Sequence, residues 1–370
     1  MHISKILLKN FRNFSEIDFS FNKNLNFILG KNGSGKTSVL ESIHYLAYTK
    51  SFRAGNDREV IRNDDDFFQI YGEFVNGEET DKLNLNYVKS EGKRILINQQ
   101  ILEKKRDIIG KYPVISLTPD NEKITKGSPN ERRSFVDKIL SQTDNLYFRS
   151  LLAYNHSLKQ RNSLLKKKRE VKDLGYDTLL ESIDELMIQD AFTIVSKRDR
   201  FIKDFNELFK EEIHKVSHFS YGCELRVNFR SPAKDEKFHE KYHNKLKEKI
   251  TKDVILGRTS YGPHLDNIDV YFDNREIKKI ASQGEHKVSL IALKMAEGQY
   301  IQKMLQASVI YLLDDLFALL DSDHCLRTIR EISNDNQTIV TSTSLDHIEK
   351  EKEMLGARNY KLIELNGNVG

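Results

Sequence analysis

The chain has 370 residues, of which 38% are apolar and 31% charged, so it is long enough for two domains with real hydrophobic cores. No run approaches the roughly 18 consecutive apolar residues of a membrane span, which excludes an integral membrane protein, and we expect no signal peptide. The 59 basic and 55 acidic residues give a net charge of +4, which permits nucleic-acid binding without requiring it. Two lone cysteines, Cys223 and Cys325, exclude a disulfide framework and a cysteine-based zinc site, and we expect a cytoplasmic protein.

The first hundred residues predict mostly β-strands. Apolar and polar residues alternate through residues 17–21 and 83–87, which is the pattern of strands with one buried face. Further short strand candidates are residues 3–8, 25–29, 70–74 and 94–97. One helix interrupts them, because residues 39–47 carry apolar side chains at helical spacing directly after a glycine-rich loop.

The pattern becomes helical after about residue 120. Ser128 precedes Pro129 and lies three residues before Glu131, which predicts a helix that starts with a capping box. Helical spacing of apolar residues predicts a helix through residues 151–158 and an unusually long one through residues 180–208, with a turn at residues 166–175. We therefore expect an antiparallel helical hairpin inserted into an α/β protein.

The remainder of the chain alternates strands and helices. The predicted strands are residues 225–229, 268–272, 308–313, 338–340 and 361–365, and the predicted helices are residues 238–250, one from Ser282, and one in each later gap between strands. Such βα alternation favours a parallel sheet. We expect one α/β nucleotide-binding domain formed by residues 1–120 and 255–370, with residues 121–254 as an inserted helical domain.

The strongest motif is a phosphate loop, with the sequence Gly30-Lys31-Asn32-Gly33-Ser34-Gly35-Lys36-Thr37. An apolar strand precedes it and an amphipathic helix follows it, as the phosphate-loop motif requires. An ordinary glycine-rich turn does not require these two flanking elements. The glycines let the backbone wrap around phosphates, and the helix directs its N–H groups at the anion. We expect Lys36 to reach the β- and γ-phosphates of ATP and the Thr37 hydroxyl to bind Mg²⁺.

A second motif is the hydrophobic run at residues 309–313, which ends in Asp314 and Asp315. P-loop proteins place a carboxylate at the end of a buried strand as a further Mg²⁺ contact. Asp314 is the candidate metal ligand, and Asp315 is the candidate for orienting or deprotonating the attacking water. On its own this run also fits an ordinary strand before an acidic turn, so the assignment depends on the phosphate loop.

A third motif, Ser282-Gln283-Gly284-Glu285, opens a predicted helix about 30 residues before the two acids. Ser282 and Gly284 offer a hydroxyl and unobstructed backbone N–H groups to an anion at a helix N-terminus. The alternative is a serine N-cap without a ligand. A single chain, whose phosphate loop already holds the ATP phosphates, needs no second phosphate-binding element for the same ATP. In a pair of chains, the Ser282 loop of one copy can cap the γ-phosphate that the phosphate loop of the other copy holds. This predicts a homodimer with ATP between its subunits.

These motifs, with Leu320-Asp321 as a candidate D-loop, resemble the ABC-type ATPase heads of SMC-like proteins. Further stretches narrow the resemblance to the RecF family of bacterial DNA replication and repair proteins, over essentially the whole chain. They are LKNFRN at residues 8–13, KSFR at 50–53, KGSPNERR at 126–133, GRT at 257–259, GPH at 262–264 and ASQGE at 281–285.

The resemblance implies a P-loop NTPase fold, namely an ABC/SMC-like ATPase head with a short coiled-coil-like helical insertion. It implies dimerisation on ATP, binding of single-stranded or gapped duplex DNA by the dimer, and help from RecO and RecR in loading recombinase during DNA damage and the SOS response. Carried over by position, Arg12 and Asn13 lie near the nucleotide, while Ser282 and Gly284 act across the dimer.

Several positions depart from the wider ABC pattern. Asp315 stands where most ABC proteins have glutamate, which suits slow turnover. Thr341-Ser342 follow the strand where many carry a switch histidine, and His264-Leu265-Asp266 replaces the usual His-Arg-Asp. No glutamine is assigned to the Q-loop.

DNA contacts and the class of function leave alternatives open. Residues 159–172 contain seven Lys or Arg and one Glu, which suits either phosphate contacts or a solvated helix tip. No base-reading motif is present, so sequence-independent DNA binding is expected. Instead of an ATPase switch, the chain also fits a non-catalytic ATP-switched adaptor or the nucleotide-binding subunit of another ABC machine such as an importer; a small-molecule kinase fits less well, since no substrate lid is evident.

Overall fold

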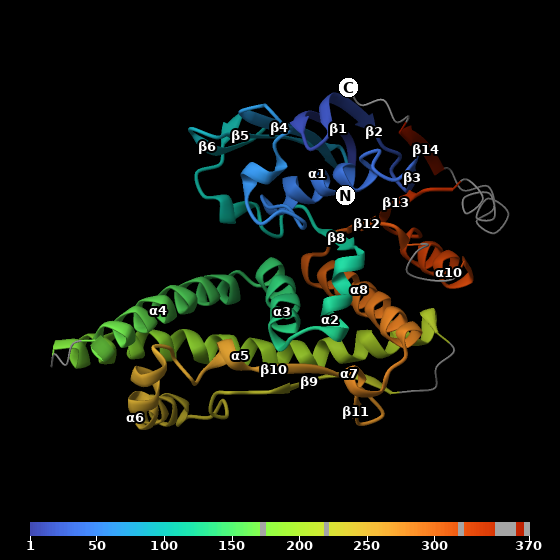
Figure 1. Cartoon of the computed structure of the whole chain (residues 1–370). Coiled ribbons are helices and arrows are strands. Elements are labelled where there is room, and N and C mark those ends of the chain that lie inside the picture. The colour runs from blue at the N-terminus through green and yellow to red at the C-terminus, as the bar shows by residue number, and fades with distance from the viewer. Residues whose placement is uncertain (171–174, 218–221, 317–321, 345–359, 366–370) are drawn as a thin grey trace. The chain divides into compact units, whose positions relative to one another are not determined.

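The computed structural model describes residues 1–170, 175–217, 222–316, 322–344 and 360–365. The chain forms two compact units (Figure 1). The first unit is Met1–Glu122, Glu212–Phe219 and Ser282–Gly370, and the second is Lys123–Glu211 and Ser220–Ala281. No helix among the described residues is both long and apolar enough to cross a membrane.

One sheet of the first unit is antiparallel and has the strand order β2-β1-β4-β5-β6-β7. Its strands are β1 (His2–Phe11), β2 (Phe14–Ser20), β4 (Phe67–Asn76), β5 (Glu79–Val88), β6 (Gly92–Ile97) and β7 (Gln100–Ile101). Along β4 every second residue is buried from Phe68 to Phe74, as expected of a strand with one buried face. The predicted strands in this part of the chain are confirmed.

The second sheet of this unit is parallel throughout, in the order β14-β3-β13-β12-β8. Its strands are β3 (Leu25–Gly30), β8 (Val114–Leu117), β12 (Ile310–Leu313), β13 (Gln337–Ser342) and β14 (Tyr360–Leu365). Every residue of β8, β12 and β13 is buried, as expected for parallel strands covered on both faces. The predicted parallel sheet is confirmed, but β8 was not predicted, because four residues, three of them apolar, are too short a run to show a periodicity.

The first unit also contains helices. The first unit contains α1 (Lys36–Tyr48), α8 (Gln283–Leu305), α10 (Ser322–Ile332) and the 3-10 turns at Asp57–Val60, Lys105–Ile108 and Pro119–Glu122. The helix expected between the last two strands falls on residues 345–359, outside the described residues.

A buried glutamine joins the two sheets of the first unit. Gln337 on β13 accepts a hydrogen bond from Ile3 N–H on β1 at 2.7 Å and donates to the Ile3 carbonyl at 2.8 Å. Its amide also donates to the carbonyl of Asn22 at 2.8 Å. These three bonds satisfy polar backbone groups where the sheets meet and tie the N-terminal strand to the parallel sheet.

The second unit is mainly helical. Its helices are α2 (Lys123–Lys126), α3 (Pro129–Thr143), α4 (Asn145–Glu170), α5 (Gly175–Val216, which ends in the first unit), α6 (Phe238–Leu256) and α7 (Ile277–Ile280), with a 3-10 turn at Pro263–Leu265. A small antiparallel sheet has the order β11-β10-β9, with β9 (Cys223–Asn228), β10 (Asn267–Phe272) and β11 (Arg275–Glu276). Because β10 pairs with β9, the residues between the end of α6 and Ala281 belong to this unit. The predicted boundary of the inserted domain, between residues 254 and 255, stays a prediction.

The predicted helical hairpin consists of α4 and α5, which lie side by side (Figure 1). Ion pairs join Arg161 to Asp184 at 2.7 Å and Lys197 to Asp144 at 2.5 Å. Arg161, well along α4, pairs near the start of α5, whereas Asp144, directly before α4, pairs with Lys197 further along α5, so the two helices are antiparallel. Residues 171–174 of the predicted turn lie outside the described part of the chain.

The start of α3 corrects one prediction. Ser128 is the N-cap and Pro129 the first helical residue, as expected, but the Ser128 side chain makes no capping hydrogen bond. The backbone N–H of Glu131 instead donates to the Ser128 carbonyl at 3.1 Å. The capping box predicted here is therefore wrong.

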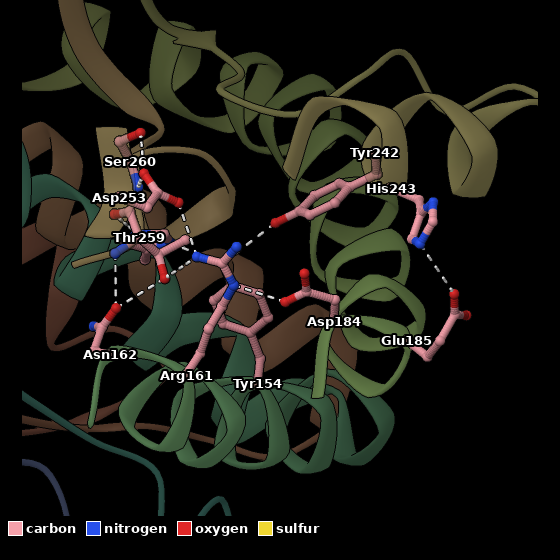
Figure 2. A network of polar contacts seen from close by, with 11 residues as sticks. Tyr154, Arg161, Asn162, Asp184, Glu185, Tyr242, His243, Asp253, Thr259 and Ser260 are labelled. Atoms are coloured by element: carbon pink, nitrogen blue, oxygen red, sulfur yellow. Dashed lines mark hydrogen bonds and ion pairs between the residues drawn. The ribbon is translucent and has the colours of Figure 1, made fainter. Parts of the chain in front are cut away.

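The basic cluster at residues 159–172 is only partly a surface feature. The Arg161 side chain is fully buried, and its guanidinium contacts Asp184 and Asp253, at 2.7 and 2.8 Å (Figure 2). Lys168 pairs with Asp177. Because its side chain is buried, Arg161 cannot contact a DNA phosphate, and it belongs to the packing of the second unit. Loss of either partner would leave an uncompensated buried charge in that unit.

The His264-Leu265-Asp266 turn is also part of the second unit's packing. His264 Nδ1 lies 2.7 Å from the Tyr154 hydroxyl, and burial lowers the pKa of His264 to about 4, so the ring is neutral near pH 7. Asp266 accepts a hydrogen bond from the buried guanidinium of Arg198 at 2.7 Å. A structural role explains both side chains.

Candidate nucleotide-binding site

The phosphate loop connects β3 to α1, as predicted, and two of its glycines adopt conformations that other residues avoid. Gly33 has φ 82° and Gly35 has φ 98°, both in the left-handed region. A Cβ atom on Gly35 would lie 2.5 Å from the Phe14 ring and 2.8 Å from the Asn13 amide. The loop thus needs glycine at residue 35 for its backbone angle and for the close approach of the β1–β2 turn.

The ammonium group of Lys36 lies within this loop. Its Nζ donates hydrogen bonds to the carbonyls of Gly30 at 2.6 Å and Lys31 at 3.0 Å. Burial lowers the pKa of Lys36, while the nearby carboxylates of Asp315 and Asp314 act in the opposite direction. The arrangement holds a partly desolvated cation, which attracts an anion more strongly than a solvated one does.

Two buried polar atoms at the loop find no hydrogen-bond partner among the residues that the structure describes. They are the Ser34 hydroxyl and the Asn13 side-chain oxygen. Buried polar atoms are nearly always satisfied, so an unpaired hydroxyl at a phosphate loop fits a missing anionic partner. The residues present therefore fit a bound nucleotide phosphate.

Asp314 and Thr37 meet although 277 positions separate them in the sequence. The Thr37 hydroxyl lies 2.9 and 3.0 Å from the two Asp314 carboxylate oxygens, and the Thr341 hydroxyl donates to Asp314 at 3.0 Å. Burial raises the pKa of Asp314. A hydroxyl and a carboxylate side by side are oxygen ligands of the kind Mg²⁺ prefers, and Mg²⁺ usually completes its shell with phosphates and water. The two side chains fit such an ion.

Asp315 is held in an unusual backbone conformation. Its φ is 53°, in the left-handed region where aspartate and asparagine are tolerated better than most residues. Its N–H donates to the Thr341 hydroxyl at 2.9 Å. Thr341 thus contacts both acids.

A cavity of about 820 Å³ brings most of the expected residues together. Of the predicted residues it is lined by Arg12, Asn13, Asn32, Gly33, Gly35, Lys36, Thr37, Asp314 and Asp315. Gly30, Lys31 and Ser34 belong to the same loop without lining it, and Ser282 and Gly284 do not line it. The cavity has the dimensions of a ligand pocket.

Sequence reasoning missed part of this cavity. Arg53, Glu59 and Arg62 also line it. The KSFR stretch contains Arg53 but carries no periodicity or spacing that points to a phosphate, so only the fold reveals its position.

Ser282 opens α8 with a complete capping box. Its hydroxyl accepts a hydrogen bond from Glu285 N–H at 3.3 Å, and the Glu285 side chain accepts from Ser282 N–H at 2.7 Å. Gly284 has open space where a side chain would stand, and both residues are exposed. Within one chain Ser282 therefore has the N-cap role. The candidate D-loop, Leu320-Asp321, lies outside the described residues.

Comparisons with known proteins agree over nearly the whole chain. The family described as RecF/RecN/SMC N terminal domain matches residues 2–363. The DNA replication and repair protein RecF of Chloroherpeton thalassium is 33% identical over 368 residues, which cover 96% of this chain and 99% of the relative. RecF of Bacillus thuringiensis is 34% identical over 358 residues, with 95% and 94% covered.

Solved structures of RecF and of an Smc head domain are similar to this chain in fold. The recombination mediator protein RecF bound to ATPrS, from the RecFOR pathway, superimposes with a TM-score of 0.87 at 26% identity and covers 94% of this chain and 93% of its own. An Smc head domain of Pyrococcus furiosus, at 19% identity and a TM-score of 0.53, is similar in fold over 95% of this chain and 91% of its own. The predicted fold class, an ABC/SMC-like P-loop ATPase head with a helical insertion, is confirmed.

Proposed function

Since the chain belongs to the RecF family of the RecF/RecN/SMC proteins, we propose that it is an ATP-dependent DNA-binding protein of DNA replication and recombinational repair. The observation that carries this proposal is the contact of Thr37 with Asp314 next to the loop that holds Lys36. The same elements, joined from opposite ends of the chain, are the parts that P-loop ATPases use. A solved relative of 26% identity is described as RecF with ATP, which supports ATP as the ligand.

Five of the residues at the cavity and its loop then have distinct roles. Lys36 exchanges its backbone carbonyl partners for phosphate oxygens, and the loop N–H groups and the Ser34 hydroxyl donate to the same anion. Thr37 and Asp314 would hold Mg²⁺, which would supply positive charge next to the phosphates. Asp315 orients the attacking water or accepts its proton. A carboxylate one methylene shorter than the usual glutamate favours slow hydrolysis, so that ATP acts as a switch.

The switch requires a second copy of the chain. Ser282 and Gly284 present a hydroxyl and an open helix N-terminus on the surface, and neither lines the cavity of its own chain. A helix N-terminus favours an anion, and the γ-phosphate of ATP held by a second copy is one. We therefore expect an ATP-induced homodimer that closes on DNA.

The partners follow from the relatives. The solved relative is described as a recombination mediator in the RecFOR pathway, which supports RecO and RecR as partners and recombinase loading as the outcome. The exposed lysines of the basic cluster are candidates for contacting the backbone of single-stranded or gapped duplex DNA without reading its bases.

DNA binding that depends on the nucleotide tests this function. We expect a gapped duplex to bind about tenfold or more tightly with ATP or a slowly hydrolysed analogue than with ADP, because only the triphosphate bridges two subunits. Fluorescence anisotropy across a salt series measures both the affinity and the number of phosphate contacts, since log K falls linearly with log salt concentration. Equal binding in all three nucleotides would contradict the clamp and favour an adaptor.

Mixing two defective variants tests whether Ser282 acts across the dimer. Lys36→Ala removes the phosphate-loop cation, and Ser282→Arg blocks the helix N-terminus. Each variant alone is expected to be inactive in ATP hydrolysis. A mixed dimer contains one intact composite site, so mixing should restore part of the activity; if Ser282 served its own subunit, the mixture would stay as inactive as either variant.

A further inference from the structure

A fully buried carboxylate lies beside the nucleotide cavity without lining it. Glu41 stands on α1, four residues after Thr37, and its side chain has no exposed surface. It accepts hydrogen bonds from Nε of Arg12 at 2.9 Å and from Nη2 of Arg12 at 2.5 Å, a two-pronged contact. It also accepts one from the hydroxyl of Ser51. These three hydrogen bonds, two of them from a cation, hold the buried carboxylate in place.

The first partner, Arg12, is placed on the cavity wall by several constraints. Its backbone has φ 57°, and its N–H donates to the carbonyl of Val60 at 2.8 Å. Its Nη1 donates to the carbonyl of Glu59 at 2.8 Å. A guanidinium has five N–H donors, and three are used here, so donors remain for a ligand in the cavity that Arg12 lines.

The second partner, Ser51, extends this support to another cation. The Ser51 hydroxyl donates to Glu41 and accepts from the backbone N–H groups of Arg53 at 2.8 Å and Ala54 at 2.7 Å. These bonds define the turn that carries Arg53, which lines the same cavity. One carboxylate on the phosphate-loop helix thus connects to two arginines from separate loops.

We propose that Glu41 is a positioning residue that holds Arg12 directly, and Arg53 through Ser51, against the phosphates of a bound nucleoside triphosphate. This inference rests on the proposed function, because it assumes a triphosphate in the cavity. Fixing both guanidinium groups before binding lowers the entropic cost of contacting the ligand. The γ-phosphate adds charge that two positioned cations recognise, so the arrangement favours ATP over ADP.

The test compares ATP and ADP affinity in Glu41→Gln, Arg12→Ala and the double variant, by titration calorimetry with Mg²⁺ present. Glu41→Gln keeps the size of the side chain but removes its charge. We expect an ATP affinity about tenfold lower and a smaller loss for ADP, as for one weakened charge-assisted bond. Because Glu41 acts in part through Arg12, the loss of ATP affinity in the double variant should be smaller than the sum of the two single losses, with the remaining effect of Glu41 passing through Ser51 and Arg53.

A matched control is Glu297→Gln on α8, which removes another fully buried carboxylate that pairs with a lysine, Lys294, at 2.7 Å. Its melting temperature is expected to fall while its ATP-to-ADP affinity ratio stays that of the unchanged chain. Ser51→Ala, which leaves the Glu41–Arg12 contact in place, should lower ATP affinity by less than Glu41→Gln.

Two results would overturn the inference. One is a Glu41→Gln protein with a lowered melting temperature but an unchanged ATP-to-ADP ratio, as a purely structural ion pair predicts. The other is full additivity of the Glu41 and Arg12 effects on ATP affinity. Failure of the proposed function looks different, because the unchanged chain itself would then not bind ATP.

Discussion

Replacement of Lys36 by alanine is expected to lower the affinity for ATP by about 100-fold or more. Lys36 is the desolvated cation of the phosphate loop, and two charge-assisted hydrogen bonds to phosphate are together worth about 3 kcal/mol or more. Titration calorimetry with ATP and Mg²⁺ measures the loss. The fold should survive, because the hydrogen bonds that Lys36 makes in the described part of the chain go to the carbonyls of Gly30 and Lys31, which α1 does not need for its own hydrogen bonds.

Lys82→Ala is the matched control, since Lys82 is an exposed lysine on β5 outside the cavity. Its ATP affinity should equal that of the unchanged chain. A Lys36→Ala protein that binds ATP as tightly as this control would rule out the phosphate loop as the binding site, whatever the family relationship.

Asp315→Asn is expected to slow ATP hydrolysis by about 100-fold or more, as loss of a general base does, while ATP still binds. Asparagine suits this position because it tolerates the left-handed backbone of Asp315 and keeps the side-chain shape. Without hydrolysis the ATP-bound dimer should accumulate. Single-turnover kinetics measures the chemical step, and gel filtration in saturating ATP measures the dimer.

The contrasting variant is Asp314→Asn, which alters the carboxylate that contacts Thr37. It should weaken the dependence of ATP binding on Mg²⁺, whereas Asp315→Asn should leave that dependence intact. An Asp315→Asn protein that stays monomeric in saturating ATP would contradict the composite site formed by two subunits.

The sequence alone determined the parts of the molecule whose signals are local. The phosphate loop is one continuous stretch between a strand and a helix, and the alternating or helical spacing of apolar residues predicted most strands and the hairpin of α4 and α5. These features could be predicted because neighbouring residues in the chain are also neighbours in the structure.

The tertiary structure decided what depends on residues far apart in the chain. It places Asp314 beside Thr37, inserts β8 into the parallel sheet, and brings Arg53 to the same cavity as Arg12. It also removes Arg161 from the candidate DNA surface, because Asp184 and Asp253 surround it. In the sequence, a lysine or arginine within a charged run looks the same whether its side chain is solvated or buried in the fold. Only the packing of distant elements determines which carboxylates contact it.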